Sequence, residues 1–133
     1  AYHEFYSVCS LNGKGYMLVG FGGEADTWEY DPVQNKWTAK AKFPPGLRLE
    51  SMAFALGSKI YMGAGAKNTD FSNIQDDLWE FDPVSNTWKQ VTVLPYARQG
   101  AFAVSVEGRA FVGTGVNLSN QTISDWWEFI PKK

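Results

Sequence analysis

The segment RLESMAFALGSKIYMGAG, residues 48–65, occurs a second time without a gap as RQGAFAVSVEGRAFVGTG, residues 98–115. The shift of 50 positions pairs Ala53 with Ala103 and superposes the glycines of GAG on those of GTG. A shift of 45 positions brings residues 3–20 onto the same pattern, so a third copy opens the chain. A repeat period near 50 residues predicts a propeller or a solenoid.

A second module follows each copy. It is WEYDPVQNKW from Trp28, WEFDPVSNTW from Trp79 and a truncated WEFIP from Trp127. Its Asp-Pro pair favours a turn, because proline fixes φ and aspartate accepts hydrogen bonds from nearby backbone N–H groups. The module therefore predicts a third strand, a reversal and a fourth strand that begins at Trp37 or Trp88.

Within a repeat the apolar residues alternate. Met52, Phe54 and Leu56 are separated by small residues, which is the period of a strand. A two-residue reversal such as Gly57-Ser58 and a second apolar run then complete a hairpin. Four strands per repeat and no helical stretch indicate an all-β fold built from propeller blades.

The predicted organisation is one propeller segment over residues 1–133. Blade 1 covers about 3–42, blade 2 about 48–93 and blade 3 about 98–133, each a four-stranded antiparallel meander. Blade 3 lacks its outer strand, because a shift of 48 positions from Trp88 places the next such tryptophan at position 136.

Three blades form an open arc, whose two flanks would expose more apolar surface than a soluble monomer tolerates. Two sources of the remaining blades stay open, a longer chain or a second copy of this one. We favour the longer chain, because only two residues precede the first matched position and no spare strand is available for a partner.

These features resemble the kelch repeat family. The shared pattern is an arginine before the first strand, glycines closing the second, an aromatic-Asp-Pro on the third and a tryptophan on the fourth. The resemblance implies a closed ring of blades whose loops bind other proteins, with a minority of galactose-oxidase-like and sugar-isomerising enzymes. Two departures are His3 in place of the first arginine, and a glycine doublet that is clean only at Gly22-Gly23.

Composition excludes several classes of protein. Hydrophobic residues make up 44% of the chain, which is enough for a globular core. Twelve basic residues face 14 acidic ones without any basic run, so we expect no nucleic-acid partner. No apolar run of about eighteen residues appears, so we expect no membrane insertion. The compartment stays open.

Residues repeated in every blade are best explained by packing. The repeated aromatics of the third strand are therefore expected between blades. Cys9 shares the register of Phe54 and is expected to be a small buried hydrophobe. His3 has no second His or Cys partner, so we expect no copper or zinc site, and hence no galactose oxidase chemistry, in this segment. We also expect no cofactor.

Arg48 and Arg98, with His3 in register, begin the innermost strands and have two interpretations. In the first, their donors satisfy backbone carbonyls of adjoining blades. In the second, they bind ligand as a ring of positive charge at the mouth of the central channel, suited to an acidic sugar or to a partner's carboxylates.

The loops between second and third strands are not repeated. Five residues follow Gly20, whereas residues 66–76 and 116–124 form longer loops on the face that carries the arginines. Variable loops on a fixed scaffold are where recognition usually resides. The binding candidates there are Asn68, Asp70, Phe71, Asn73, Asn117 and Asn120.

The sequence thus predicts a non-catalytic kelch-repeat module that binds a protein or a glycan through this face. The alternative is part of a sugar-modifying propeller enzyme of the mutarotase or epimerase type, in which Glu4 or Glu50 would move protons. No pair of carboxylates or Ser-His-Asp set supports a catalytic assignment, so no catalytic residue is predicted and an enzyme is the less favoured reading.

Overall fold

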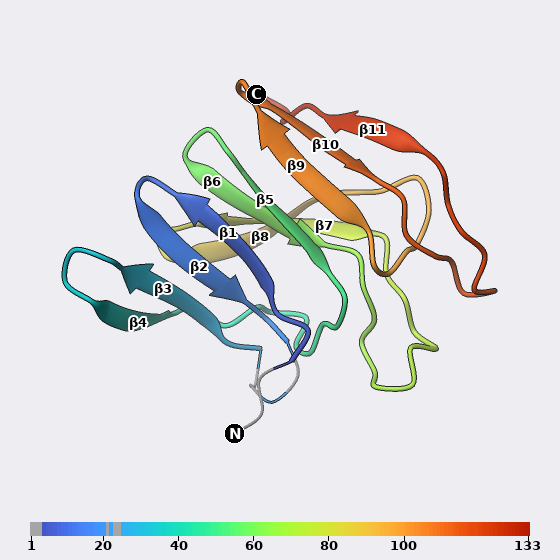
Figure 1. Cartoon of the computed structure of the whole chain (residues 1–133), viewed down its shortest axis with the longest axis horizontal. Helices are drawn as coiled ribbons and strands as arrows, with labels where there is room; N and C mark the ends of the chain where they lie inside the picture. Colours follow the sequence, from blue (N-terminus) through green and yellow to red (C-terminus); the bar gives the residue numbers. More distant parts are fainter. Residues whose placement is uncertain (1–3, 21, 23–24) are drawn as a thin grey trace.

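The computed structural model describes residues 4–20, 22 and 25–133 and contains three antiparallel sheets (Figure 1). Blade 1 consists of β1 (Ser7–Leu11), β2 (Lys14–Leu18), β3 (Thr27–Asp31) and β4 (Lys36–Lys40). Blade 2 consists of β5 (Met52–Leu56), β6 (Lys59–Gly63), β7 (Asp77–Asp82) and β8 (Thr87–Val93). Blade 3 consists of β9 (Phe102–Val106), β10 (Arg109–Gly113) and β11 (Trp126–Phe129).

Each strand pairs with the next one in sequence, so every blade is a meander. The predicted all-β fold of about three antiparallel blades, the last without its outer strand, is confirmed. The described residues form no helix, and so none that could cross a membrane.

The reversals follow from their residues. At the β1–β2 hairpin, Asn12 and Gly13 have φ of 52° and 76°, as a two-residue turn between twisted strands requires. After β3 and β7, the Oδ1 atoms of Asp31 and Asp82 each accept a hydrogen bond at 2.9 Å, from the backbone N–H of Val33 and of Val84 respectively. These contacts are the turns predicted from the two Asp-Pro pairs.

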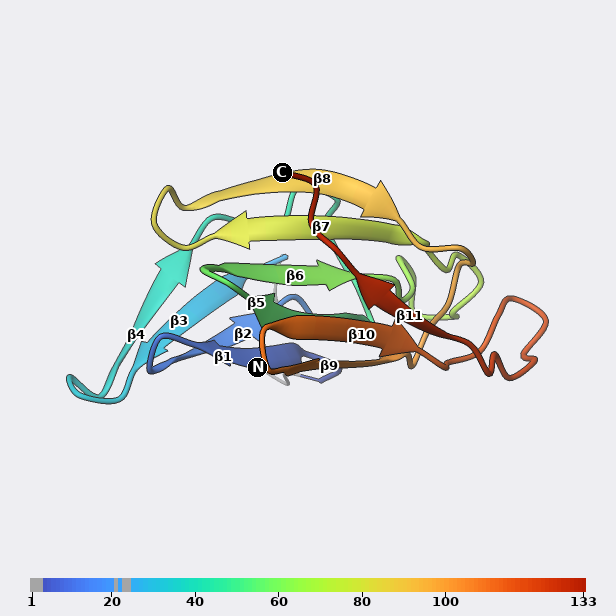
Figure 2. The same ribbon diagram turned by 90° about the horizontal axis from the view of Figure 1, so that it is seen from above.

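The innermost strands β1, β5 and β9 lie side by side, while the outer strands β4 and β8 diverge (Figure 2). Hydrogen bonds tie the inner strands together across blades. The Ser7 hydroxyl donates to the Ser51 carbonyl at 2.8 Å, and the Ser105 hydroxyl donates to the Ala55 carbonyl. The blades therefore radiate from a common inner edge.

The core lies between blades and not within one sheet. The first interface, between blades 1 and 2, buries Leu11, Tyr16, Leu18, Val19, Ala25, Phe43, Ile60, Met62 and Phe81. The second interface, between blades 2 and 3, buries Met52, Phe54, Tyr61, Ala64, Leu78, Leu94, Ala110 and Val112. Of the repeated aromatics, Trp79 and Phe81 pack in the first interface and Phe129 packs in the second, as predicted, whereas Trp127, the counterpart of Trp79 in blade 3, is 46% exposed.

The outer flanks of the arc are apolar and open. Met52 and Phe54 of β5 are each 3% exposed, whereas their counterparts Phe102 and Val104 of β9 are 56% and 37% exposed. On the other flank Val8 is exposed as well. The same strand position is therefore buried where a neighbouring blade is present and open where the described residues provide none.

Candidate recognition face

The loops of residues 66–76 and 116–124 leave blades 2 and 3 at the same end, which we call the loop face (Figure 1). Their bases are built alike. Ala66 bridges to Leu49 and Ile74, and Val116 bridges in the same way to Gln99 and Thr122. Both loops therefore start from one repeated scaffold, and only their tips differ.

Asn68 braces the tip of the blade 2 loop. Its Oδ1 accepts from the Asn73 N–H at 3.1 Å, and its Nδ2 donates to Ser72 Oγ at 2.8 Å. Asp70 Oδ1 accepts from the Ser72 N–H at 3.0 Å. Hydrogen bonds from the backbone and side chain of Ser72 hold the pKa of Asp70 below its usual value, so this exposed carboxylate stays charged at neutral pH.

Phe71 adds an aromatic ring to this tip. It has φ of 56°, a conformation that non-glycine residues rarely adopt, and its side chain is half-buried. Its ring meets the ring of Phe5 edge-to-face, with centroids 6.1 Å apart. The blade 2 loop thereby contacts the segment that precedes β1, which extends the loop face toward blade 1.

Asn117 braces the tip of the blade 3 loop. Its Oδ1 accepts from the N–H groups of Ser119 and Gln121, both at 3.0 Å, and its Nδ2 donates to Gln121 Oε1 at 3.2 Å. Asn120 has φ of 55° and an exposed side chain. Of the predicted loop residues, Asn68 and Asn117 therefore hold the loops in shape, while Asp70 and Asn120 present polar groups to solvent.

Arg48 lies four residues before β5 and is fully buried. Its Nη1 donates to Asp77 Oδ1 at 2.5 Å and its Nη2 to Asp77 Oδ2 at 2.9 Å. Nη1 also donates to the Ala64 carbonyl at 2.8 Å. The guanidinium lies 5.2 Å from the ring centre of Phe43.

Arg98 repeats this arrangement in blade 3. It is also fully buried, donates to both carboxylate oxygens of Asp125 at 2.6 and 2.8 Å, and donates to the Thr114 carbonyl at 3.1 Å. The Ala64 and Thr114 carbonyls belong to the same blade as the arginine that binds them, and Arg98 Nε also donates at 3.2 Å to the carbonyl of Tyr96, in the segment that joins blades 2 and 3. The two side chains therefore lie inside the blades and form no ring of charge at the surface.

The aspartates of these pairs are strongly biased toward the charged form. Burial alone would raise the pKa of Asp77, but the hydrogen bonds and charge of Arg48 hold it below its usual value. The hydrogen bonds from Arg98 lower the pKa of Asp125 to about 2. The sequence analysis did not predict that Asp77 and Asp125 pair with the arginines. The pattern that could have indicated it is an aspartate two positions before each repeated tryptophan.

The remaining candidates are scattered. His3 lies outside the described residues. Glu4 is exposed, and Glu50 is half-buried just before β5, with φ of 49°. Cys9 packs against the first interface, and burial raises its pKa to about 12, so its thiol stays protonated near neutral pH. In the part of the chain that the structure describes, no three His, Cys, Asp or Glu side chains gather as metal ligands.

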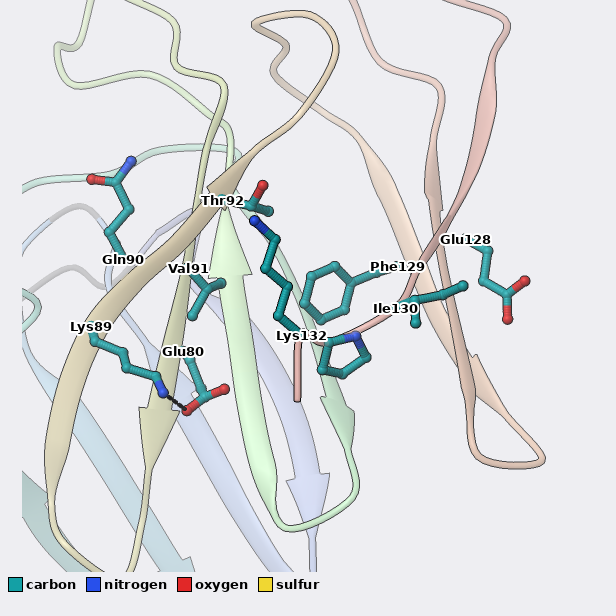
Figure 3. A pocket seen from close by; sticks show the side chains of 10 residues that line it. Glu80, Lys89, Gln90, Val91, Thr92, Glu128, Phe129, Ile130 and Lys132 are labelled. Atoms are coloured by element: carbon teal, nitrogen blue, oxygen red, sulfur yellow. Dashed lines mark ion pairs between the residues drawn. The ribbon is translucent and has the colours of Figure 1, made fainter.

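A cavity of about 510 Å³ lies away from the loop face, between β8 and the segment that begins in β11 (Figure 3). Val91 and Thr92 line it from blade 2, and Phe129, Ile130 and Pro131 line it from blade 3. Sequence reasoning did not identify this cavity. The sequence feature that could have indicated it is the absence of a fourth strand after β11, because that strand would lie beside this space.

Comparison with known proteins gives matches that agree with this architecture. Residues 48–95 match the model of the Kelch motif. An N-acetylneuraminate epimerase of Salmonella typhi is 28% identical over 116 residues, which are 81% of this chain and 30% of that protein. An N-acetylneuraminate epimerase of Escherichia coli O157:H7 is 28% identical over 107 residues, which are 76% of this chain and 29% of that protein.

The solved structure titled "Structure of YjhT" superposes with a TM-score of 0.79 at 23% identity. The match covers 90% of this chain and 36% of that one. At this identity the likeness concerns the fold. The chain spans about 30% of the length of the curated relatives it matches.

Proposed function

Because this chain is a segment of a kelch-type β-propeller, we propose that it is a non-catalytic recognition module that binds a protein or a glycan through the loop face. The observation that carries the proposal is the contrast between loop bases and loop tips. The bases repeat the same bridges in both blades, whereas the tips differ in length and sequence. Variation confined to the tips of a fixed scaffold is typical of recognition surfaces.

The tips are also preorganised. The side chains of Asn68 and Asn117 each make hydrogen bonds that close their own loop. A partner would therefore bind loops that are already ordered, at a smaller entropic cost than flexible loops would impose. The groups presented there are the Asp70 carboxylate, the Asn120 amide and part of the Phe71 ring.

These groups suit a partner rich in hydroxyl and amide groups. An asparagine amide both donates and accepts, and a carboxylate accepts from hydroxyls. An aromatic ring offers a flat apolar face. The names of the relatives make N-acetylneuraminate the first sugar to test.

The test compares the parent chain with a loop variant in which Asp70, Phe71 and Asn120 are all alanine. A control variant changes Val33 and Val84, exposed on the opposite turns, to serine. N-acetylneuraminate and a neutral N-acetylated hexosamine are titrated against each by NMR, and the three chains serve as baits for protein partners with quantitative mass spectrometry. We expect a sugar or a protein that binds the parent and control chains at least about tenfold more tightly than the loop variant. Equal retention by all three chains would contradict the proposal.

The second candidate is a part of a sugar-modifying propeller enzyme, and the names of the relatives favour it. Arg48 and Arg98 are already paired with carboxylates, so the proton-transfer candidates are Glu4 and Glu50. The test measures interconversion of N-acetylneuraminate stereoisomers by NMR, with Glu4→Gln and Glu50→Gln variants of the protein. Loss of turnover in either variant supports this candidate, and unchanged turnover removes both carboxylates from it.

A further inference from the structure

Each blade has a left-handed residue just before its innermost strand. Phe5, Glu50 and Gly100 lie two residues before β1, β5 and β9, with φ of 60°, 49° and 62°. We call these three residues the inner rim. Glycine adopts this conformation without strain, whereas the Cβ of any other residue makes it unfavourable. The fold therefore needs the backbone conformation in every blade, but it does not need the side chains of Phe5 and Glu50.

The inner rim opens on the loop face. β5 and β6 are antiparallel, so Glu50 lies at the end of blade 2 from which the loop of residues 66–76 leaves. Phe5 is 48% exposed, and its ring contacts Phe71 of that loop. The Gly100 N–H donates to the Glu50 carbonyl at 3.1 Å, which joins the rim positions of blades 2 and 3. The rim thus continues the recognition surface from the loop tips to the inner strands.

Gly100 leaves room beside the Glu50 carboxylate. A Cβ built on Gly100 would have one described atom within 4 Å outside its chain neighbours, and that atom is Glu50 Oε2 at 3.7 Å. A larger side chain at this rim position would therefore cover the carboxylate. With glycine there, one side of the carboxylate stays open to a ligand.

The Glu50 side chain is half-buried and makes no hydrogen bond or ion pair in the part of the chain that the structure describes. The other half-buried or buried carboxylates there all have a partner, namely Asp26, Glu29, Asp31, Asp77, Glu80, Asp82 and Asp125. A partly buried charge without a partner loses hydration and gains nothing in return. A ligand explains this carboxylate better than the fold does.

The charge of the surface indicates the kind of ligand. The two buried arginines are already paired with aspartates inside their blades. Glu4, Glu50 and Asp70 form no ion pair within the described residues, and Lys67 is the exposed basic residue of the blade 2 loop. Three carboxylates near one lysine attract a cation and repel an acidic sugar.

We propose that the Glu50 carboxylate binds an arginine of a protein partner, while Phe5 and Phe71 pack on an apolar residue next to that arginine. This inference rests on the proposed function and narrows the partner from a protein or a glycan to a protein. The planar guanidinium can donate to both oxygens of a carboxylate. The aromatic pair supplies the apolar contact area that protein interfaces use.

The probe is the peptide Gly-Leu-Arg-Leu-Gly, titrated into the isotopically labelled 133-residue chain and followed by NMR. The comparison peptide carries citrulline, which has nearly the shape of arginine but no charge. The arginine peptide should shift the amide signals of Glu50, Phe71 and Gly100 and bind at least about fivefold more tightly than the citrulline peptide. Glu50→Gln in the chain should remove that difference. No binding, or equal binding of the two peptides by the parent chain, would overturn the proposal.

Glu107→Gln is the matched control. Glu107 is also a glutamate with φ of 49°, and it is exposed in the β9–β10 turn, at the opposite end of the blade from the loop face. This variant should bind the arginine peptide as the parent does. Glu50→Gln should keep the urea midpoint of the parent chain, because no internal partner is lost. A lower midpoint would identify Glu50 as a structural residue and refute the assignment.

The variant with alanine at Asp70, Phe71 and Asn120 separates this inference from the proposed function. A partner that this variant loses and Glu50→Gln retains in full would refute the role of Glu50 and leave the loop face as the recognition surface. A partner that Glu50→Gln loses and the alanine variant retains would support the rim and contradict the role of the loop tips. Shifts of the rim amides by N-acetylneuraminate but not by the arginine peptide would refute the charge argument.

Discussion

Replacement of Asp77 by alanine tests whether the buried arginines hold the blades together. The change removes both carboxylate oxygens that face Arg48 and the acceptor of Trp79 Nε1, 2.9 Å away. Arg48 stays fully buried, because Phe43 and the blade 2 backbone enclose it. One hydrogen bond, to the Ala64 carbonyl, remains for its Nη1.

The expected loss follows from that geometry. A guanidinium cannot lose its proton, so the variant keeps a buried charge without its counterion. Removing one partner of a buried ion pair costs about 3–5 kcal/mol. Domains of this size unfold with about 5–15 kcal/mol, so Asp77→Ala removes a large share of the stability. Asp77→Asn keeps an acceptor for Trp79 and should lose less.

The assay is urea unfolding at pH 7, followed by tryptophan fluorescence and analysed as the midpoint and slope of the transition. Glu128→Ala is the matched control, since Arg109 also contacts both of its carboxylate oxygens, at 2.8 Å, but the pair is exposed. Its midpoint should stay within error of the parent. Equal midpoints for Asp77→Ala and Glu128→Ala would refute the structural role of the buried pair.

Three further predictions concern acid, backbone and thiol chemistry. Because Arg98 lowers the pKa of Asp125 to about 2, this pair stabilises the fold fully above the unfolded value near 4. Urea midpoints should therefore fall between about pH 4 and 2, and Asp125→Asn should flatten that decline. Gly65→Ala should lower the free energy of unfolding by roughly 3 kcal/mol, because φ at Gly65 is +77° and the new Cβ would lie 2.3 Å from the Leu49 carbonyl oxygen. Gly57→Ala, at φ +61° and with no atom near the new Cβ, should lower it by about 1 kcal/mol in the same urea assay. Cys9, with a pKa raised to about 12, should react with a disulfide reagent at pH 8 far more slowly in the native chain than in urea, and equal rates would contradict its packing.

The blades were predictable because three copies of one pattern constrain each other. Each copy has an alternating first strand, as at Met52 and Phe54, a reversal after that strand and a tryptophan on the third strand. The same physical requirements are therefore visible three times in the sequence. A wrong strand assignment in one copy would have been inconsistent with the sequence of the next copy. The strand order and the missing outer strand of blade 3 could therefore be predicted without knowledge of any contact.

The candidate site was less predictable, because its chemistry depends on pairing across sequence. Arg48 is separated from Asp77 by 29 positions, and nothing local indicates that the two side chains meet. The loop tips have no second copy for comparison. The side chains of Asn68 and Asn117 turn inward and hydrogen-bond within their own loops because of the local backbone geometry, and the identity of the five polar loop candidates does not specify that geometry.

Comparison of the repeats also distinguishes residues that build the blades from residues that could give this segment its binding specificity. Phe102 and Met52 occupy one strand position, yet one is 56% exposed and the other 3%, so exposure at the flanks reflects the missing neighbour and not a surface made for a ligand. Residues that every blade repeats therefore describe how blades join, including at the edge of β11. Residues that no other blade repeats, such as Asp70 and Asn120, are left to distinguish this segment from another of the same fold.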